Sequence, residues 1–305
     1  MSGLSELDEI LGLFEKKEPT QQEQKPVLET PVPPKVETAP ETLPSEKKTE
    51  IALEPQKKEV EEKAVFELTE DGIPSKEVYL IYGNKGVGKT VTALSFPGKI
   101  LALSFDRKTA IIKANMFKND DRIKIYNAVK YMDYSNPEAL TKSANDTYQY
   151  ILFILEEHVK HYGNPDWVLI DGSDIFHQIC EWTMRYRHNI EPFAGISNLN
   201  VWKERRLLIR NIHYKALDIA NKGVIYTTYT EKDSIVVDGE LITQKDVPRW
   251  IDVLMFETDY VLYCYVIEGQ RKFAVRVVTS KNDSKLRTGM VYDVTDRTLW
   301  EVVKR

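Results

Sequence analysis

The sequence predicts an α/β fold in which a mostly parallel sheet carries helices on both faces and ends in antiparallel hairpins. From about residue 65 onward, short apolar runs alternate with longer amphipathic stretches, a pattern typical of strand–helix–strand units. After Thr228 the helical stretches stop, and strand-like runs are separated by Asp-Gly and Glu-Gly pairs that favour tight turns. The first 64 residues share neither pattern, which predicts a separate tail.

Five apolar runs are rich in Val, Ile, Leu and aromatic residues, as is typical of strands buried on both faces. They are Glu77–Tyr82, Lys99–Phe105, Arg122–Asn127, Trp167–Asp171 and Val224–Thr228. Helices are predicted over Lys89–Phe96, Pro137–His161, Ser173–Arg187 and Asn200–Lys222. The two hairpins pair Ser234–Val237 with Glu240–Thr243 and Tyr260–Ile267 with Gln270–Thr279.

The composition of the sequence predicts a disordered, acidic tail over residues 1–64 and one folded domain over residues 65–305. Residues 1–75 hold nine of the fourteen prolines and a net charge of −9, which leaves +4 for the remainder. Such a composition buries too little apolar surface to offset the entropy of ordering. Within residues 2–17, however, apolar side chains recur at helical spacing. This segment is either a peptide that docks on a protein partner or a short helix that lies on its own domain.

Several classes of protein are disfavoured. Cys180 and Cys264 are too few and too far apart for a zinc cluster or a disulfide framework. No apolar run approaches the ~20 residues that span a membrane, and Glu6, Asp8 and Glu9 stand where a signal peptide needs positive charge. We therefore expect a cytoplasmic, intracellular protein without a membrane partner.

The segment Gly83-Asn84-Lys85-Gly86-Val87-Gly88-Lys89-Thr90 satisfies the phosphate-loop (Walker A) pattern G-x-x-x-x-G-K-[ST]. It follows an apolar strand and opens a helix, which is the context that the mechanism requires. The glycines let consecutive backbone N–H groups point at phosphates. Lys89 then supplies a cation to the β- and γ-phosphates, and Thr90 places its hydroxyl on Mg²⁺. The pattern predicts a P-loop nucleoside triphosphatase that uses ATP and Mg²⁺.

A second magnesium ligand is expected from the apolar strand that ends at Asp171. Asp171 lies 82 residues after Lys89, and a carboxylate at the end of a buried strand suits the metal shell. The alternative is that Asp171 only caps the next helix, a role that Ser173 could fill equally well.

The run Tyr79–Asp106, YLIYGNKGVGKTVTALSFPGKILALSFD, resembles the RecA-superfamily ATPases of phages, viruses and archaea, and most of all their single-strand annealing type. Those proteins share a second strand with an acidic end, an acid-tipped strand and a Trp-led helix. A strand ending in Thr or Ser follows, and a last hairpin leads to a basic cluster. The corresponding residues here are Asp106, Asp171, Trp202, Thr227 and Thr228, and Lys281, Lys285 and Arg287. The resemblance implies a RecA-like fold, ATP hydrolysis, a ring or filament of identical subunits and a phage- or virus-encoded origin.

The same resemblance suggests catalytic roles. In the family the second strand tends to end in Asp-x-Glu, whose Glu polarises the attacking water; here Ser104 and Asp106 stand at these positions. Asp106 is either this catalytic acid or a cap of the next segment. Thr228 either senses the γ-phosphate or is a strand residue. One cation of the last cluster would reach a neighbouring subunit's phosphate, or all three are solvated surface residues.

GTP is a second candidate nucleotide, because Ser280-Lys281-Asn282-Asp283 approaches the guanine-reading [NT]-K-x-D pattern. Against GTP, the third residue after Asp171 is not glycine. A GTPase switch needs a glycine there, whose backbone N–H contacts the γ-phosphate.

The resemblance also implies single-stranded DNA as a partner, through the segments Arg187–Asn200 and Glu231–Trp250 and the basic helix Asn200–Lys222. Cations beside aromatic rings suit single strands, although helices routinely carry such cations as a solvated face. Trp250 is either a stacking platform for bases or a core residue. Two functions therefore compete. One is a recombination or annealing ATPase that binds single-stranded DNA. The other is a nucleotide-gated adaptor that hydrolyses ATP poorly and recruits a partner through its N-terminal segment.

Overall fold

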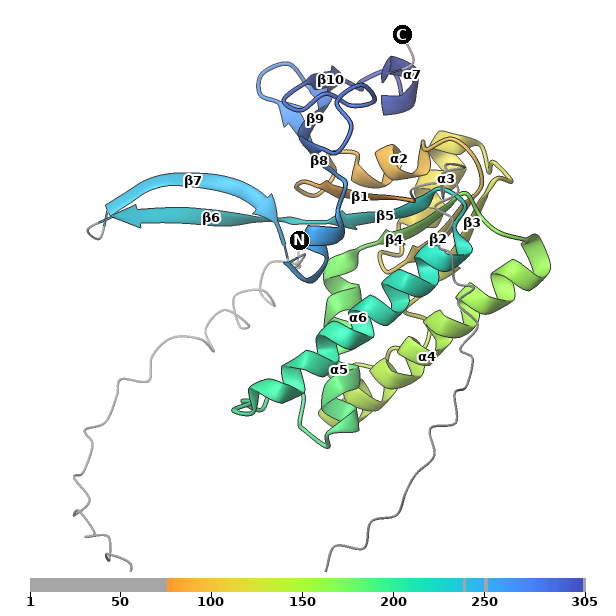
Figure 1. Ribbon diagram of the computed structural model, residues 1–305, viewed down its shortest axis with the longest axis vertical. Helices are drawn as coiled ribbons and strands as arrows, with labels where there is room; N and C mark the ends of the chain where they lie inside the picture. Colours follow the sequence, from red (N-terminus) through yellow and green to blue (C-terminus); the bar gives the residue numbers. More distant parts are fainter. Residues whose placement is uncertain (1–75, 238–239, 250–251, 304–305) are drawn as a thin grey trace, which may run out of the picture. The chain divides into compact units, whose positions relative to one another are not determined.

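The computed structural model describes residues 76–237, 240–249 and 252–303. Its main element is an eight-stranded sheet with the order β10-β9-β8-β1-β5-β4-β2-β3 (Figure 1). Neighbouring strands from β8 to β3 run parallel, whereas β9 and β10 are added antiparallel at one edge. The strands of this sheet are β1 (Glu77–Tyr82), β2 (Ile100–Ser104), β3 (Ile123–Asn127), β4 (Trp167–Asp171), β5 (Gly223–Thr228), β8 (Tyr260–Ile267), β9 (Lys272–Ser280) and β10 (Val291–Asp293).

Alternate residues of the central strands are buried against two different sets of helices, because successive strand side chains point to opposite faces. In β1, Val78, Leu80 and Tyr82 pack with the helices of one face, whereas Tyr79 and Ile81 pack with those of the other. The first face carries α4 (Pro137–Tyr162), α5 (Ser173–Arg187) and α6 (Leu199–Ile219), and the second carries α2 (Lys89–Leu94), α3 (Thr109–Phe117) and α7 (Leu299–Val303). The continuous apolar runs seen in the sequence are therefore strands covered on both sides.

A second, two-stranded sheet is formed by β6 (Thr230–Val237) and β7 (Glu240–Pro248), which leave the end of β5 as a long hairpin (Figure 1). The hairpin is longer than predicted, because the mostly polar residues on the side of each run away from the turn also pair, from Thr230 with Pro248 to Asp233 with Lys245. Its predicted turn, Asp238-Gly239, lies outside the described residues, as does the whole tail. A 3₁₀ helix, η2 (Asp252–Glu257), connects the hairpin to β8.

The predicted fold class is confirmed. Strands β1, β4 and β5 and the antiparallel hairpin of β8 and β9 all belong to one mostly parallel sheet with helices on both faces. Helix α3 was not predicted, because its apolar residues give no clear stripe: Ile111 and Met116 are both about 60% exposed. Within the described residues, no helix combines the length and the hydropathy that crossing a membrane requires.

Candidate nucleotide-binding site

The phosphate loop lies where the carboxyl ends of β1, β2, β4 and β5 meet. Parallel pairing places Ser104 beside Asp171, Asp171 beside Thr227, and Tyr82 beside Thr228. The loop leaves β1 at this edge and α2 begins at Lys89. Between the loop and the strand ends is a cavity of about 700 Å³. Crevices at the carboxyl edge of a parallel sheet are the usual ligand sites of such folds.

The loop has the backbone conformation that its glycines permit. Gly88, which precedes α2, has a left-handed φ of 92° that favours glycine. A Cβ atom at Gly83 would lie 2.2 Å from the carbonyl oxygen of Cys264, so no larger residue fits there. Asn84, Lys85 and Gly86 are exposed while Val87 is buried, so the loop is anchored by one apolar side chain and is otherwise open to a ligand.

The structure brings both predicted magnesium ligands into contact. The Thr90 hydroxyl donates to Asp171, with Oγ1 3.0 Å from Oδ1 and 3.2 Å from Oδ2. Among the described residues no cluster of three or more His, Cys, Asp or Glu side chains could hold a metal by itself. One hydroxyl and one carboxylate still fit Mg²⁺, which is usually bound by few protein oxygens together with substrate phosphates. The donor set therefore fits a magnesium–nucleotide complex.

Two further hydroxyls hold Asp171, and the sequence analysis gave neither of them this role. Thr109 donates to Oδ2 at 2.6 Å, and Thr227 donates to Oδ1 at 2.6 Å while accepting from the Gly172 backbone N–H. Burial raises the pKa of Asp171, and these hydrogen bonds with Thr90 oppose the rise. The pairing of Thr227 follows from two parallel strands ending together, but Thr109 carries no signal in the sequence because its segment lacks helical periodicity.

Lys89 lies in the same cavity. Its Nζ atom donates to the carbonyl oxygens of Gly83 (2.9 Å) and Asn84 (2.8 Å) and lies 4.2 Å from the centre of the Tyr229 ring. Burial lowers the pKa of Lys89, and nearby acidic groups, with Asp171 among the strongest, oppose this. The ammonium group is thus held at the loop by neutral acceptors and an aromatic face, which anionic phosphates could replace.

Asp106 and Thr228 line the cavity, but each side chain has a partner in its own backbone neighbourhood. Asp106 Oδ1 accepts from the backbone N–H of Lys108 at 3.2 Å, just before α3 begins. Thr228 Oγ1 donates to the carbonyl oxygen of Arg249 at 2.9 Å, where the hairpin ends. These contacts are those of a cap and of a strand anchor, and neither tests the predicted catalytic roles.

The guanine-reading alternative does not fit the structure. Lys281 follows β9 and pairs with Asp259 at 2.9 Å. Ser280 lies opposite Tyr260, at the start of β8. This is the amino edge of the sheet, across the length of β1 from the loop, so Ser280–Asp283 cannot read a base whose phosphates are bound at Gly83–Thr90.

The basic cluster that was expected to reach a neighbouring subunit lies at the same amino edge. Lys285 pairs with Glu77 at 2.5 Å, and its ammonium group lies over three aromatic rings. Like Lys281, it already has a carboxylate partner within the chain, whereas Arg287 is exposed. The cluster joins the start of β1 to the last hairpin.

Many of the cations expected to contact DNA also have carboxylate partners. On α6, Arg205 pairs with Glu181, Arg210 with Glu257 and Lys215 with Glu156. On the hairpin, Lys232 pairs with Asp246 at 2.6 Å. Lys203, Arg206, Lys245 and Arg249 are exposed, whereas Trp250 lies outside the described residues.

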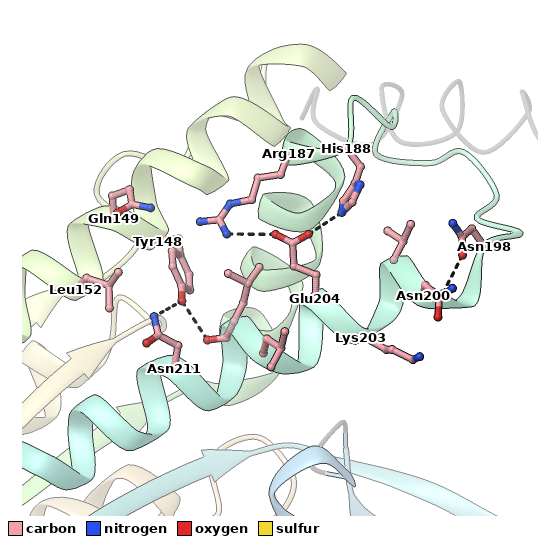
Figure 2. A pocket seen from close by; sticks show the side chains of 13 residues that line it. Tyr148, Gln149, Leu152, Arg187, His188, Asn198, Asn200, Lys203, Glu204 and Asn211 are labelled. Atoms are coloured by element: carbon pink, nitrogen blue, oxygen red, sulfur yellow. Dashed lines mark hydrogen bonds and ion pairs between the residues drawn. The ribbon is translucent and has the colours of Figure 1, made fainter. Parts of the chain in front are cut away.

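A second cavity, of about 670 Å³, lies where α4, the end of α5 and α6 meet (Figure 2). Figure 2 shows that its polar side chains turn toward one another: Glu204 pairs with Arg187 (3.2 Å) and His188 (2.6 Å). Asn211 donates to the Tyr148 hydroxyl at 2.9 Å. Because these groups satisfy each other, this cavity is a weaker candidate than the one at the loop, where a loop of backbone N–H groups, a lysine and acidic side chains converge.

Neither a protein-family model nor a curated protein matches this sequence. Among solved structures, a KaiC-like protein of the hyperthermophilic archaeon Pyrococcus horikoshii matches it with a TM-score of 0.38 and 13% sequence identity. The match covers 71% of this chain and 84% of that chain. A similarity at this level assigns no activity, so function has to be inferred from the geometry of the site.

Proposed function

We propose that the protein binds ATP with Mg²⁺ and hydrolyses it to ADP and phosphate. The observation that carries this proposal is the contact between the Thr90 hydroxyl and the Asp171 carboxylate, 3.0 Å apart in a cavity that Lys89 also lines. A glycine loop, a lysine, a hydroxyl and a buried carboxylate are the parts that phosphoryl transfer requires of a P-loop protein.

Each of these residues has a distinct task. The backbone N–H groups of the loop and the start of α2 would hold the β- and γ-phosphates. Lys89 would exchange its carbonyl partners for phosphate oxygens, and Thr90 and Asp171 would hold Mg²⁺. The bound metal would neutralise charge that develops on the phosphate oxygens. Thr109 and Thr227 position Asp171, since each donates a 2.6 Å hydrogen bond to it.

The direct test measures binding and turnover on the purified protein. We expect a fluorescent ATP analogue to bind in the presence of Mg²⁺, unlabelled ATP to displace it, and phosphate to be released slowly from ATP. Chelation of Mg²⁺ with EDTA should stop phosphate release. A protein that binds no nucleotide at millimolar concentration would contradict the proposal.

The biological role that we propose is DNA recombination or single-strand annealing, by a ring or filament of subunits bound to single-stranded DNA. Supporting it, exposed Lys245 and Arg249 lie on the hairpin that leaves the cavity edge after Thr228. Exposed Lys203 and Arg206 on α6 could add phosphate contacts. The resemblance to phage annealing ATPases supports the same role.

DNA binding is tested at Lys245. Binding to labelled single strands in the presence of ATP should fall steeply as salt rises, since each phosphate contact releases a counterion. Lys245→Glu should weaken binding to all sequences alike and reduce the slope of log affinity against log salt by about 1. Lys142→Glu, at an exposed position on α4, is the charge-matched control and should bind like the parent. Absence of binding at low salt would exclude this role.

The second candidate role is a nucleotide-gated adaptor that recruits a protein partner through residues 2–17. The ion pairs of Arg205, Arg210 and Lys215 favour it, because cations already paired within the chain contribute less to DNA binding. Residues 2–17 lie outside the described residues, so the partner segment rests on its apolar periodicity alone. A competing peptide of residues 2–17 would displace the partner if this role is correct.

A further inference from the structure

Asp174 is an acidic side chain in the wall of the nucleotide cavity, and no motif in the sequence marks it as functional. It lies in the first turn of α5, three residues after Asp171, and it lines the cavity together with Lys89, Thr90 and Asp171. It is only 8% exposed. Among the described residues its Oδ1 atom is buried without a hydrogen-bond partner. Buried polar atoms are normally paired, so an unpaired carboxylate oxygen in a residue that lines the nucleotide cavity singles out Asp174 as a candidate functional residue.

The surroundings of Asp174 suit an acceptor of protons. Burial raises the pKa of Asp174, which is opposed by the backbone N–H groups of Asp174 and Ile175 and by the charges of Arg249 and Lys89. Asp171, Asp106 and Tyr229 line the same cavity. A carboxylate whose pKa is raised by burial is a stronger proton acceptor than an exposed one.

Asp106, the acid that the family resemblance suggests, is placed differently. It is partly exposed, and its Oδ1 atom already accepts from the Lys108 backbone N–H at 3.2 Å. Its own carbonyl oxygen lies 3.0 Å from the Thr109 hydroxyl oxygen. These contacts organise the start of α3 and so position Thr109, which in turn holds Asp171. One oxygen of the Asp106 carboxylate therefore has a structural task at the start of α3, whereas Asp174 Oδ1 has no hydrogen-bond partner among the described residues.

We propose that Asp174, rather than Asp106, accepts the proton of the water that attacks the γ-phosphate. This assignment rests on the proposed ATPase function. In the step, the water oxygen forms a bond to the γ-phosphorus and one water proton moves to the Asp174 carboxylate. The bond between the γ-phosphorus and the β–γ bridging oxygen breaks, and its electron pair stays on ADP. The proton then passes from Asp174 to solvent or to the released phosphate.

The test compares two carboxylate-to-amide variants. Asp174→Asn should lower kcat by about 100-fold or more, the usual contribution of a general base, while the affinity for the ATP analogue stays within about threefold. Asp106→Asn should lower kcat far less than Asp174→Asn does, because its carboxylate acts on the start of α3 and not on the attacking water. Asp146→Asn, at an exposed position on α4, is the control and should match the parent. A kcat of Asp174→Asn at the parent level, or a large loss confined to Asp106→Asn, would overturn the assignment.

Chemical rescue separates proton transfer from a structural role. Asp174→Ala removes the carboxylate and leaves room for a small acid, so added formate should restore part of kcat in this variant but not in Lys89→Ala. The acid limb of the kcat profile of the parent should also disappear in Asp174→Asn. No rescue together with an unchanged pH profile would show that Asp174 is structural.

Failure of the assignment and failure of the ATPase proposal give different results. If the parent hydrolyses ATP and Asp174→Asn does so equally well, only the assignment is wrong. If the parent binds ATP but releases no phosphate above background, hydrolysis and the assignment both fall and only nucleotide binding stands. Melting curves of each variant show whether a loss of activity reflects unfolding.

Discussion

Lys89→Ala is expected to reduce ATP hydrolysis by at least about 100-fold, the scale observed when one preorganised electrostatic group is removed from a transition state. The affinity for ATP should fall as well, because the phosphates lose their main protein cation. Phosphate release and displacement of a fluorescent ATP analogue measure the two effects separately.

The effect is specific because of where Lys89 lies. Its ammonium group is held within hydrogen-bond distance of the Gly83 and Asn84 carbonyl oxygens and over the Tyr229 ring. None of these partners carries a negative charge, so the ammonium group leaves them at little cost when phosphate oxygens arrive. Alanine would also free the two carbonyl groups to face water at the cavity mouth, so the fold should survive.

Lys85→Ala is the matched control. Lys85 belongs to the same loop and lines the same cavity, but its side chain is exposed. Its loss should change turnover by only a few-fold, since an exposed cation is screened by solvent. Equal losses in the two variants would mean that general charge near the loop matters, and unchanged hydrolysis in Lys89→Ala would refute the proposed site.

The parts of the site that follow one another in the chain could be predicted from the sequence. Gly83–Thr90 is one continuous segment between a strand and a helix, so local pattern was sufficient to find it. Asp171 could be placed because strand β4 ends there and parallel strands share a carboxyl edge. Strands β1 to β5 were predicted to within one residue because burial on both faces leaves a continuous apolar run.

Other parts depend on tertiary placement that no local pattern encodes. Thr109 contacts Asp171 from a helix that begins 62 residues earlier in the chain, and nothing in its own segment marks it as functional. In the sequence, Asp174 is indistinguishable from the acidic residues that commonly occur in the first turn of a helix. The cations of α6 and of the last hairpin looked available for phosphates, but their carboxylate partners come from distant elements. Charge counts along a helix cannot reveal such pairs.

Asp171→Asn is expected to raise the stability of the nucleotide-free protein while removing its response to Mg²⁺ and ATP. The pKa of Asp171 is raised above its ordinary 3.8, mainly by burial, so the ionised form is penalised in the folded state. This penalty is absent below pH 3.8 and complete above the raised pKa. The free energy of unfolding of the parent therefore falls as pH rises from 3.8 through the raised pKa, whereas that of the variant does not fall for this reason.

Asparagine can keep most of the hydrogen bonds around residue 171. Its amide oxygen can accept from Thr90 and Thr227, and its NH₂ group can donate to Thr109, whose hydroxyl then turns toward the Asp106 carbonyl oxygen 3.0 Å away. Melting temperatures of the nucleotide-free proteins at neutral pH should thus be higher for Asp171→Asn than for the parent. The difference should shrink when the pH is lowered toward 3.8, the ordinary pKa of an aspartate.

The response to nucleotide should have the opposite sign. At a concentration 100 times its Kd, a ligand that binds only the folded state stabilises by about 2.7 kcal/mol, and the parent should show this gain with Mg²⁺ and ATP. Asp171→Asn should gain no more with Mg²⁺ than with EDTA, because an amide replaces the anionic oxygen of the metal shell. Asp146→Asn should respond like the parent. If Asp171→Asn is less stable without nucleotide yet retains the Mg²⁺ response, the carboxylate is a structural acceptor of the three threonine hydroxyls and the metal ligand lies elsewhere.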